Sequence, residues 1–386
     1  MRPFSLYIHI PFCFQKCPYC DFNTYAVKHV PEGEYIAALL SELDYYANHE
    51  LFRSRSIQSI YFGGGTPSLL KPDSLGKVIE LAGALFSTSS SLEVTMEANP
   101  GGLSLEKLEG FANAGINRIS FGAQSFRLNQ LELLGRTHTG EDIENSIEYA
   151  RAAGIDNLSL DLIYGVPEQS REDLIEDLDR FLALRLPHIS LYALTIEKGT
   201  PFYQAKANKV FELPDDELVL GMMSDIDNRL LEFDYHRYEI SNYCRSGYES
   251  KHNLSYWNRD DYLGVGAGAH SFCAIADSQS ARRWSNYALP ARYMDQVTAL
   301  GSALSWHEEL DNHELQYEFF FLGLRKTSGV ELDSFEREFQ PLKDSRYMPL
   351  IKRGVENGLL EINGKNLRLT NRGIALADSV LEDFAG

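Results

Sequence analysis

Residues 1 to about 240 repeat one unit, in which a short apolar run with strand character is followed by a turn and an amphipathic helical pattern. Strands are expected at 5–10, 57–62, 92–98, 118–122, 157–164 and 188–194. Helices are expected at 31–49, 73–86, 105–114, 141–153, 171–184 and 215–233. Strands that alternate with helices of this length predict a parallel sheet covered by helices. The number of units falls short of the eight in a closed TIM barrel, so we expect an α/β fold with an incomplete (β/α)6 barrel over 1–240.

In parallel sheets of this kind, ligands bind at the carboxyl ends of the strands. Residues with useful chemistry stand at these ends in the sequence. Cys13 follows the first expected strand, and the segment 63–67, "GGGTP", follows the second. Glu97 ends the third strand, Gln124 follows the fourth, and Asp161 lies late in the fifth. We therefore expect all of them to project to one rim of the sheet.

The pattern changes after about residue 240. Residues 241–311 are rich in aromatic residues and glycine, which is typical of a connecting region that faces a ligand. From 312 to 386, helical patterns alternate with a hairpin, "GLLEINGKNLRLT", in which Asn363-Gly364 predicts the turn. This order predicts a small α+β domain of winged-helix-like shape. A net charge of −19, from 36 basic and 55 acidic residues, argues against nucleic-acid binding, so we expect this domain to serve packing or partner contact.

The sequence contains no apolar run of the roughly 20 residues that a membrane-spanning helix needs. Its first residues do not resemble a signal peptide either, because Pro3 and His9 interrupt them. We expect a cytoplasmic protein. Its five cysteines do not suggest a disulfide framework, and the isolated Cys244 and Cys273 are expected to be structural.

The other three cysteines, Cys13, Cys17 and Cys20, form the pattern CxxxCxxC. Zinc sites generally use cysteine pairs with a fourth ligand further along, which here would be Asp21, His29 or a distant residue. Iron–sulfur clusters normally take four cysteines. Three cysteines would leave one iron of a 4Fe–4S cluster open to another ligand, so the pattern by itself allows either a structural metal module or an open cluster.

Placed on the loop after the first strand of a βα barrel, CxxxCxxC resembles the radical S-adenosylmethionine (SAM) superfamily. The resemblance implies that SAM chelates the open iron and that an electron from the cluster cleaves its sulfonium group. It also gives the glycines of 63–65 a role, because backbone without side chains can approach the methionine end of SAM closely.

The motifs "YIHIPFC" (7–13), "FGGGTPS" (62–68), "EANP" (97–100), "GINRISFGAQS" (115–125) and "LDLIYGVP" (160–167) resemble the oxygen-independent coproporphyrinogen III oxidase family over nearly the whole chain. The resemblance implies that SAM is contacted by Tyr7, Tyr19, Gly64, Gly65, Thr66, Glu97, Gln124, Arg136, Asp161 and Ala193. In this assignment Arg136 pairs with the methionine carboxylate, Asp161 and Gln124 bind ribose hydroxyls, and Tyr19 lies near the adenine.

Three features depart from the oxidases proper. Those enzymes carry a further cysteine where this chain has Phe22, and a long N-terminal segment that is expected to be absent here. The third is "HNLSYW" (252–257), which matches the HNxxYW motif of a sister group, the HemW-type heme chaperones. The resemblance implies that His252 is an axial heme ligand and that Tyr256 and Trp257 face the porphyrin. A second axial ligand stays open between Cys244, His270 and none.

The sequence therefore predicts a heme chaperone that carries a 4Fe–4S cluster on Cys13, Cys17 and Cys20 together with exchangeable SAM. The alternative is an oxygen-independent coproporphyrinogen III oxidase. The expected partners are heme, heme-accepting respiratory proteins and an electron donor such as a flavodoxin or a ferredoxin-like protein. Contact with membranes is expected only peripherally, through those acceptors. Whether SAM is cleaved stays open, and with it whether the protein is an enzyme.

Overall fold

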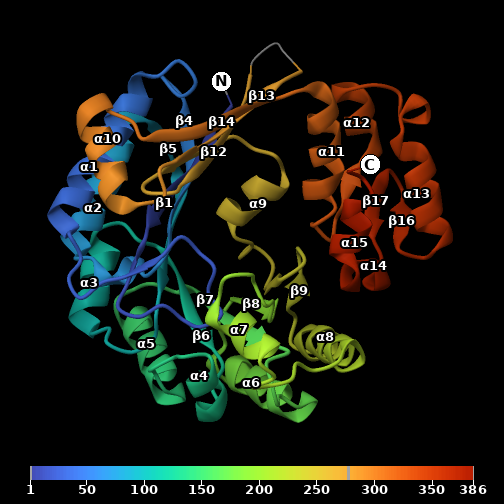
Figure 1. Cartoon of the computed structure of the whole chain (residues 1–386), viewed down its shortest axis with the longest axis horizontal. Coiled ribbons are helices and arrows are strands. Elements are labelled where there is room, and N and C mark those ends of the chain that lie inside the picture. The colour runs from blue at the N-terminus through green and yellow to red at the C-terminus, as the bar shows by residue number, and fades with distance from the viewer. Residues whose placement is uncertain (1, 276–278, 386) are drawn as a thin grey trace.

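The computed structural model describes residues 2–275 and 279–385, and its centre is a twelve-stranded mixed sheet (Figure 1). Six parallel strands follow one another across the sheet in chain order. They are β1 (Phe4–Ile10), β4 (Ser56–Gly64), β5 (Ser87–Ala98), β6 (Arg118–Gln124), β7 (Asn157–Tyr164) and β8 (His188–Ala193). The predicted α/β fold with an open six-unit βα barrel is confirmed.

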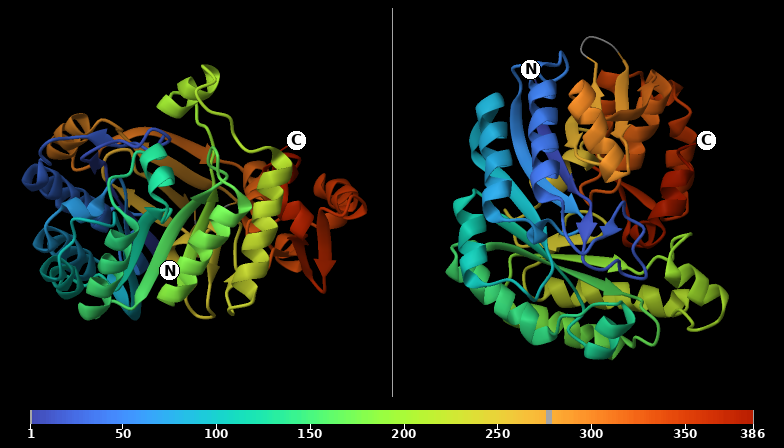
Figure 2. Two further views of the ribbon diagram at one scale, coloured as in Figure 1. Left: turned by 90° about the horizontal axis from the view of Figure 1, so that it is seen from below. Right: turned by 60° about the vertical axis from the view of Figure 1, so that its left-hand side comes forward.

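The helices between these strands pack on the outside of the sheet, as Figures 1 and 2 show. They are α1 (Glu32–Asn48), α2 (Pro72–Leu85), α3 (Leu105–Asn113), α5 (Gly140–Ala152), α6 (Arg171–Leu184) and α8 (Asp216–Leu231). Four of these helices begin after a capping residue whose side chain accepts a hydrogen bond from a backbone amide of the first turn. The capping residues are Ser104, Thr139, Ser170 and Asp215. The short helices α4 (Leu128–Leu133) and α7 (Pro201–Ala207) and the 3₁₀ turn η1 (Pro67–Leu69) were not expected.

The described residues of this region, 241–275 and 279–311, form secondary structure that the sequence pattern does not predict. Strand β11 (Tyr262–Val265) pairs in parallel with β1, and β12 (His270–Ala274), β13 (Ala281–Asn286) and β14 (Leu304–Leu310) continue the sheet in antiparallel order. On the opposite edge, β10 (Asn242–Cys244) pairs with β8 and with β9 (His236–Arg237). The same region contains α9 (Lys251–Trp257) and α10 (Pro290–Leu300).

The strands of the barrel have one apolar and one polar face. Leu6, Ile8, Ile60 and Phe62 belong to the main hydrophobic core, whereas the alternate residues, such as Ser5 and Ser59 on β1 and β4, form buried polar contacts. Because successive side chains of a strand point to opposite faces, this polar series lines the inside of the barrel. Helix α9, between the sheet and the C-terminal domain in Figure 1, contacts the polar face of β4.

The C-terminal residues form a small α+β unit, as predicted, and its three-stranded antiparallel sheet includes the predicted hairpin (Figure 1). Its elements are α11 (Asn312–Gly323), β15 (Val330–Glu331), α12 (Leu332–Glu338), η2 (Leu342–Asp344), α13 (Tyr347–Glu356), β16 (Leu360–Asn363), β17 (Asn366–Leu369), α14 (Asn371–Ala375) and α15 (Ala377–Glu382). Phe320, Phe335 and Leu367 anchor a separate core. Gly364, with φ +62°, follows β16 and forms the hairpin turn.

The division into 1–240, 241–311 and 312–386 stays a prediction. None of the described helices is long and apolar enough to cross a membrane.

Candidate functional site

A cavity of about 410 Å³ lies where the barrel strands end and gathers most of the predicted site residues. Its lining includes Cys13, Cys17, Tyr19, Cys20, Gly64, Gly65, Thr66, Glu97, Gln124, Arg136, Asp161 and Ala193. Tyr7 and His252 are the two predicted residues that do not line it. Since the lining residues come from the ends of β4 to β8 and from the cysteine loop, the parallel sheet brings them together.

The three cysteine side chains are half-buried free thiols in the loop after β1. Cys13 lies in β2 (Phe12–Cys13), which pairs with β3 (Tyr25–Ala26). The Thr66 hydroxyl donates to Cys13 Sγ at 3.4 Å, and the Arg136 guanidinium donates to Cys17 Sγ at 3.4 Å. Burial raises the pKa of the Cys13 thiol, and the hydrogen bond from Thr66 opposes that shift.

The two metal assignments for these thiols differ in the arrangement of ligands that they need. Among the described residues, no three His, Cys, Asp or Glu side chains are grouped closely enough to hold one metal ion. The thiolates of a 4Fe–4S cluster bind different iron atoms and need no such convergence.

Contacts with distant parts of the chain hold the cysteine loop in place. The Asn23 amide donates to the carbonyl oxygens of Ala267 at 3.0 Å and Ala288 at 3.1 Å. The backbone carbonyl oxygen of Asn23 is 2.9 Å from His9 Nε2. A Cβ on Gly268, which has φ +77°, would lie 2.3 Å from Asn23 Nδ2. The turn after β11 thus supports the loop that carries the cysteines.

Gly64 and Gly65 have a packing role beside the predicted ligand role. A Cβ on Gly64, which has φ +108°, would lie 2.3 Å from the His9 ring, and one on Gly65 would lie 2.6 Å from the carbonyl oxygen of Phe12. Both missing side chains therefore make room for the chain at the end of β1, while the backbone of the two glycines lines the cavity.

Two carboxyl groups in the cavity wall are held by hydrogen bonds. Glu97 accepts from the Tyr61 hydroxyl at 2.9 Å and from the Gly64 amide at 3.0 Å, and Asp161 accepts from the Ser120 hydroxyl at 3.0 Å. Burial raises the pKa of Glu97 to about 7 and raises the pKa of Asp161 above its usual value. The fixed oxygens suit the donors of a polar ligand.

Asn99 is a cavity residue that the sequence analysis did not single out. Its carbonyl oxygen accepts from Arg136 at 2.6 Å, and its amide donates to Thr66 at 3.2 Å. Arg136 also donates to the Gly122 carbonyl at 2.8 Å, so its guanidinium is fixed beside Cys17. The sequence could have indicated Asn99 as a site residue, because it belongs to the "EANP" motif at the end of a strand.

Gln124, another cavity residue, adopts a left-handed backbone, φ +68°, at an irregularity in the pairing of β6 with β7.

His252, the predicted heme ligand, lies in α9 and is 1% exposed. Its ring stacks on Tyr61, with centroids 4.9 Å apart, and lies 6.2 Å from the Tyr7 ring. The Tyr7 hydroxyl is 2.9 Å from His9 Nδ1. Burial, with the nearby Arg118 guanidinium, lowers the pKa of His252 to about 3, so the imidazole is neutral.

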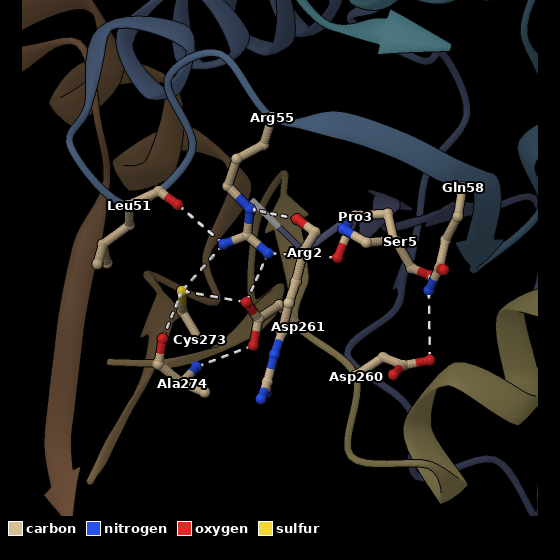
Figure 3. Close-up of polar contacts among 10 residues, drawn as sticks. All are labelled: Arg2, Pro3, Ser5, Leu51, Arg55, Gln58, Asp260, Asp261, Cys273 and Ala274. Atoms are coloured by element: carbon tan, nitrogen blue, oxygen red, sulfur yellow. Dashed lines mark hydrogen bonds and ion pairs between the residues drawn. The ribbon is translucent and has the colours of Figure 1, made fainter. Parts of the chain in front are cut away.

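The isolated cysteines lie away from the cavity. Cys273 is buried beside the ion pair of Arg55 and Asp261, whose atoms are 2.5 Å apart (Figure 3). Arg55 donates to Cys273 Sγ at 3.3 Å and also to backbone carbonyls, which joins β12 to the start of β1. Cys244 is buried in β10. Burial raises the pKa of Cys244 to about 12 and that of Cys273 to about 11.

Known proteins are similar to this chain in sequence and in fold. The Radical SAM superfamily profile matches residues 7–181, and the HemN C-terminal domain profile matches residues 310–376. Residues 7–181 thus have the sequence features of a radical SAM domain. Heme chaperone HemW of Bacillus subtilis is 36% identical over 99% of both chains, and that of Escherichia coli K12 is 34% identical over 100% of this chain and 98% of its own. The chain belongs to the HemW family of heme chaperones.

The solved structure of coproporphyrinogen III oxidase (HemN) from Escherichia coli superimposes with a TM-score of 0.84. It covers 99% of this chain and 90% of its own, at 24% sequence identity. This similarity shows a shared fold.

Proposed function

We propose that this protein binds heme and transfers it to acceptor proteins, while a 4Fe–4S cluster and exchangeable SAM occupy the cavity. The observation that carries the proposal is that one barrel holds both the three-cysteine cavity and the "HNLSYW" helix α9. The full-length similarity to heme chaperones supports it. The proposal includes a cytoplasmic location, respiratory heme proteins as acceptors, and a flavodoxin- or ferredoxin-like electron donor.

The cavity residues fit a cluster and SAM. Cys13, Cys17 and Cys20 would hold the cluster, and Arg136 already lies against one of the thiols. The Nε of Arg136 is buried without a partner in the described residues, which leaves a donor for a carboxylate. Glu97, Gln124 and Asp161 supply polar atoms for the amino group and ribose. When bound, the cluster would supply an electron to the sulfonium group of SAM.

The surroundings of α9 fit a planar, anionic ligand. His252 supplies an imidazole, and Tyr256 and Trp257 supply flat apolar surface. The Arg325 guanidinium lies 5.5 Å from the Trp257 ring, and Lys326 donates to Asn258 at the end of the helix. Trp257 Nε1 is buried without a partner in the described residues. These donors and cations would suit the propionates of heme.

The alternative, coproporphyrinogen oxidation, is less well supported. The oxidase structure shares 24% identity, whereas the similarity to heme chaperones is higher and spans the full length. Phe22, where the oxidases carry a further cysteine, is 63% exposed at the edge of the cavity. It presents an apolar surface and no thiol.

The test is a heme titration of the anaerobically reconstituted protein, followed by absorbance, with the wild type beside His252→Ala. We expect saturable one-to-one binding that the substitution weakens about tenfold or more, since an axial ligand is lost. Unchanged binding by His252→Ala would place the heme elsewhere. If the wild type shows no saturable binding, the chaperone function is wrong for this chain and coproporphyrinogen III becomes the substrate to test.

A further inference from the structure

His252 is part of a chain of buried side chains that begins on the first strand of the barrel. Ser5 lies on β1 and Ser59 on β4, and both side chains are fully buried. Ser59 Oγ is 2.9 Å from Ser5 Oγ and 2.9 Å from His252 Nδ1. On the other side of the imidazole, His252 Nε2 is 2.9 Å from the Tyr256 hydroxyl.

The direction of each hydrogen bond follows from counting protons. The Ser59 hydroxyl has one proton and donates it to Ser5 Oγ. With that proton committed to Ser5, Ser59 would accept at its contact with His252, with Nδ1–H as the donor. A neutral imidazole has one N–H, so Nε2 carries a lone pair. The Tyr256 hydroxyl donates to that lone pair.

This tautomer is the one that a metal ligand needs. A histidine that binds iron through Nε2 usually donates its Nδ1–H to a neighbouring acceptor, which fixes the ring and raises its basicity. Ser59 supplies that acceptor from a strand of the barrel. Resting on the proposed function, we propose that Ser59 is a positioning residue that prepares His252 Nε2 to bind heme iron, and that the Tyr256 hydroxyl occupies the place of the iron in this structure.

For iron to reach Nε2, Tyr256 would have to move while Ser59 keeps its place. His252 and Tyr256 lie one turn apart on α9, hence on the same face of the helix. His252 is buried, but Tyr256 is half-buried, and its ring packs edge-on against Tyr262 with centroids 4.7 Å apart. Rotation of the Tyr256 side chain would free Nε2, while Nδ1–H stays on β4.

The barrel also contains a matched control. Ser159 on β7 is 2.7 Å from His188 Nδ1, and His188 Nε2 is 2.8 Å from the Tyr238 hydroxyl. Tyr238 in turn accepts from the Ser250 amide at the start of α9. This serine–histidine–tyrosine set has the same composition and reaches the same helix, but it does not include the predicted heme ligand. Ser159→Ala therefore removes an equivalent bond without touching His252.

The experiment compares wild type with Ser59→Ala, Ser59→Thr, Ser159→Ala and Tyr256→Phe. In the heme-free protein labelled with ¹⁵N-histidine, long-range ¹H–¹⁵N spectra report the tautomer, and His252→Ala assigns the signal. Heme affinity is measured by titration, and resonance Raman spectra of the ferrous complex report the iron–histidine stretch. Each measurement uses the full chain.

We expect His252 to be protonated on Nδ1 in the wild type and to lose this preference in Ser59→Ala. Heme affinity should fall about tenfold to a hundredfold in Ser59→Ala and the iron–histidine stretch should move to lower frequency. Ser59→Thr should restore both, Ser159→Ala should match the wild type, and Tyr256→Phe should bind heme at least as tightly as the wild type.

A wild-type His252 protonated on Nε2 would overturn the inference. So would full heme affinity and an unshifted stretch in Ser59→Ala when His252→Ala loses binding, a result that leaves the proposed function intact. Heme binding that His252→Ala does not weaken would overturn both this inference and the placement of heme at α9.

Discussion

At the scale of single residues, the structure separates two kinds of cysteine. Cys13, Cys17 and Cys20 line one cavity, and Thr66 and Arg136 donate to two of the thiols. Cys244 and Cys273 are each 1% exposed and occupy strands outside that cavity. The sequence could predict this division because spacing and position after a strand are visible in it. The sequence does not show which side chains contact each thiol, because those side chains lie far away along the chain. Arg136 donates to Cys17, and Arg55 donates to Cys273.

Replacing Cys13, Cys17 or Cys20 with alanine should reduce the broad iron–sulfur absorbance and the iron content of the reconstituted protein nearly to baseline, because each removes a cluster ligand. Cys244→Ala and Cys273→Ala are the controls and should keep both signals. Cys273→Ala should also lower the free energy of unfolding by about 1–2 kcal/mol, since Arg55 loses an acceptor in a buried site. Loss of the cluster in either control would contradict the ligand assignment.

At the scale of elements, α9 depends on the barrel for its structure. A helix of seven residues is too short to be stable alone. Ser250 caps it, and the Glu93 carboxylate on β5 accepts from the Lys251 and His252 amides, each at 3.2 Å. The motif "HNLSYW" is visible in the sequence but does not indicate a helix, because about two helical turns are too few to show a clear periodicity. Glu93 itself lies on the polar face of β5, where alternation could have indicated an inward side chain.

Glu93→Ala should loosen α9, because the first amides of the helix lose a charged acceptor that is worth about 1.5–3 kcal/mol. Amide hydrogen exchange of residues 251–257 should become roughly ten- to a hundredfold faster, measured by mass spectrometry on the heme-free protein. Ser104→Ala, which removes the cap of α3 on the outside of the barrel, should leave exchange in α9 unchanged. Equal exchange in Glu93→Ala and wild type would mean that the tertiary packing of α9 does not depend on this carboxylate.

At the scale of the whole molecule, Glu42 connects the barrel to the added strands of the sheet. This fully buried residue of α1 accepts from the Gly266 amide at 3.0 Å, the Asn286 amide at 2.8 Å and the Tyr293 hydroxyl at 2.7 Å. Burial raises the pKa of Glu42 to about 7, despite these donors. One carboxyl group thus joins α1 to the turn after β11, to β13 and to α10.

The raised pKa makes the stability of this junction depend on pH. An unfolded chain releases the Glu42 proton near its ordinary pKa of 4.5, but the folded protein keeps it up to about pH 7. The contribution of Glu42 to the free energy of unfolding is therefore complete below pH 4.5 and is lost as pH rises to about 7. Between about pH 5.5 and about pH 8 the loss is on the order of 2 kcal/mol.

Urea unfolding of wild type and Glu42→Gln at these two pH values tests this expectation. Glutamine does not titrate, so the variant should lose about 2 kcal/mol less than the wild type over the same range, whatever its absolute stability. Glu80→Gln, on the helix surface, should behave as the wild type does. An identical pH dependence in Glu42→Gln and wild type would show that Glu42 is ionised in the folded protein well below pH 7.

The sequence by itself determined the repeating βα order, the location of the cysteines and glycines at strand ends, and the kind of chemistry that these residues can perform. These features are local or periodic, and a parallel sheet places all strand ends at one edge. Only the tertiary structure decided which residues meet: Asn99 beside Arg136, Asn23 against the turn after β11, and Ser59 beneath His252. It also decided that β11 to β14 extend the sheet, because these short strands have too little pattern of their own and form by pairing with β1 and with one another.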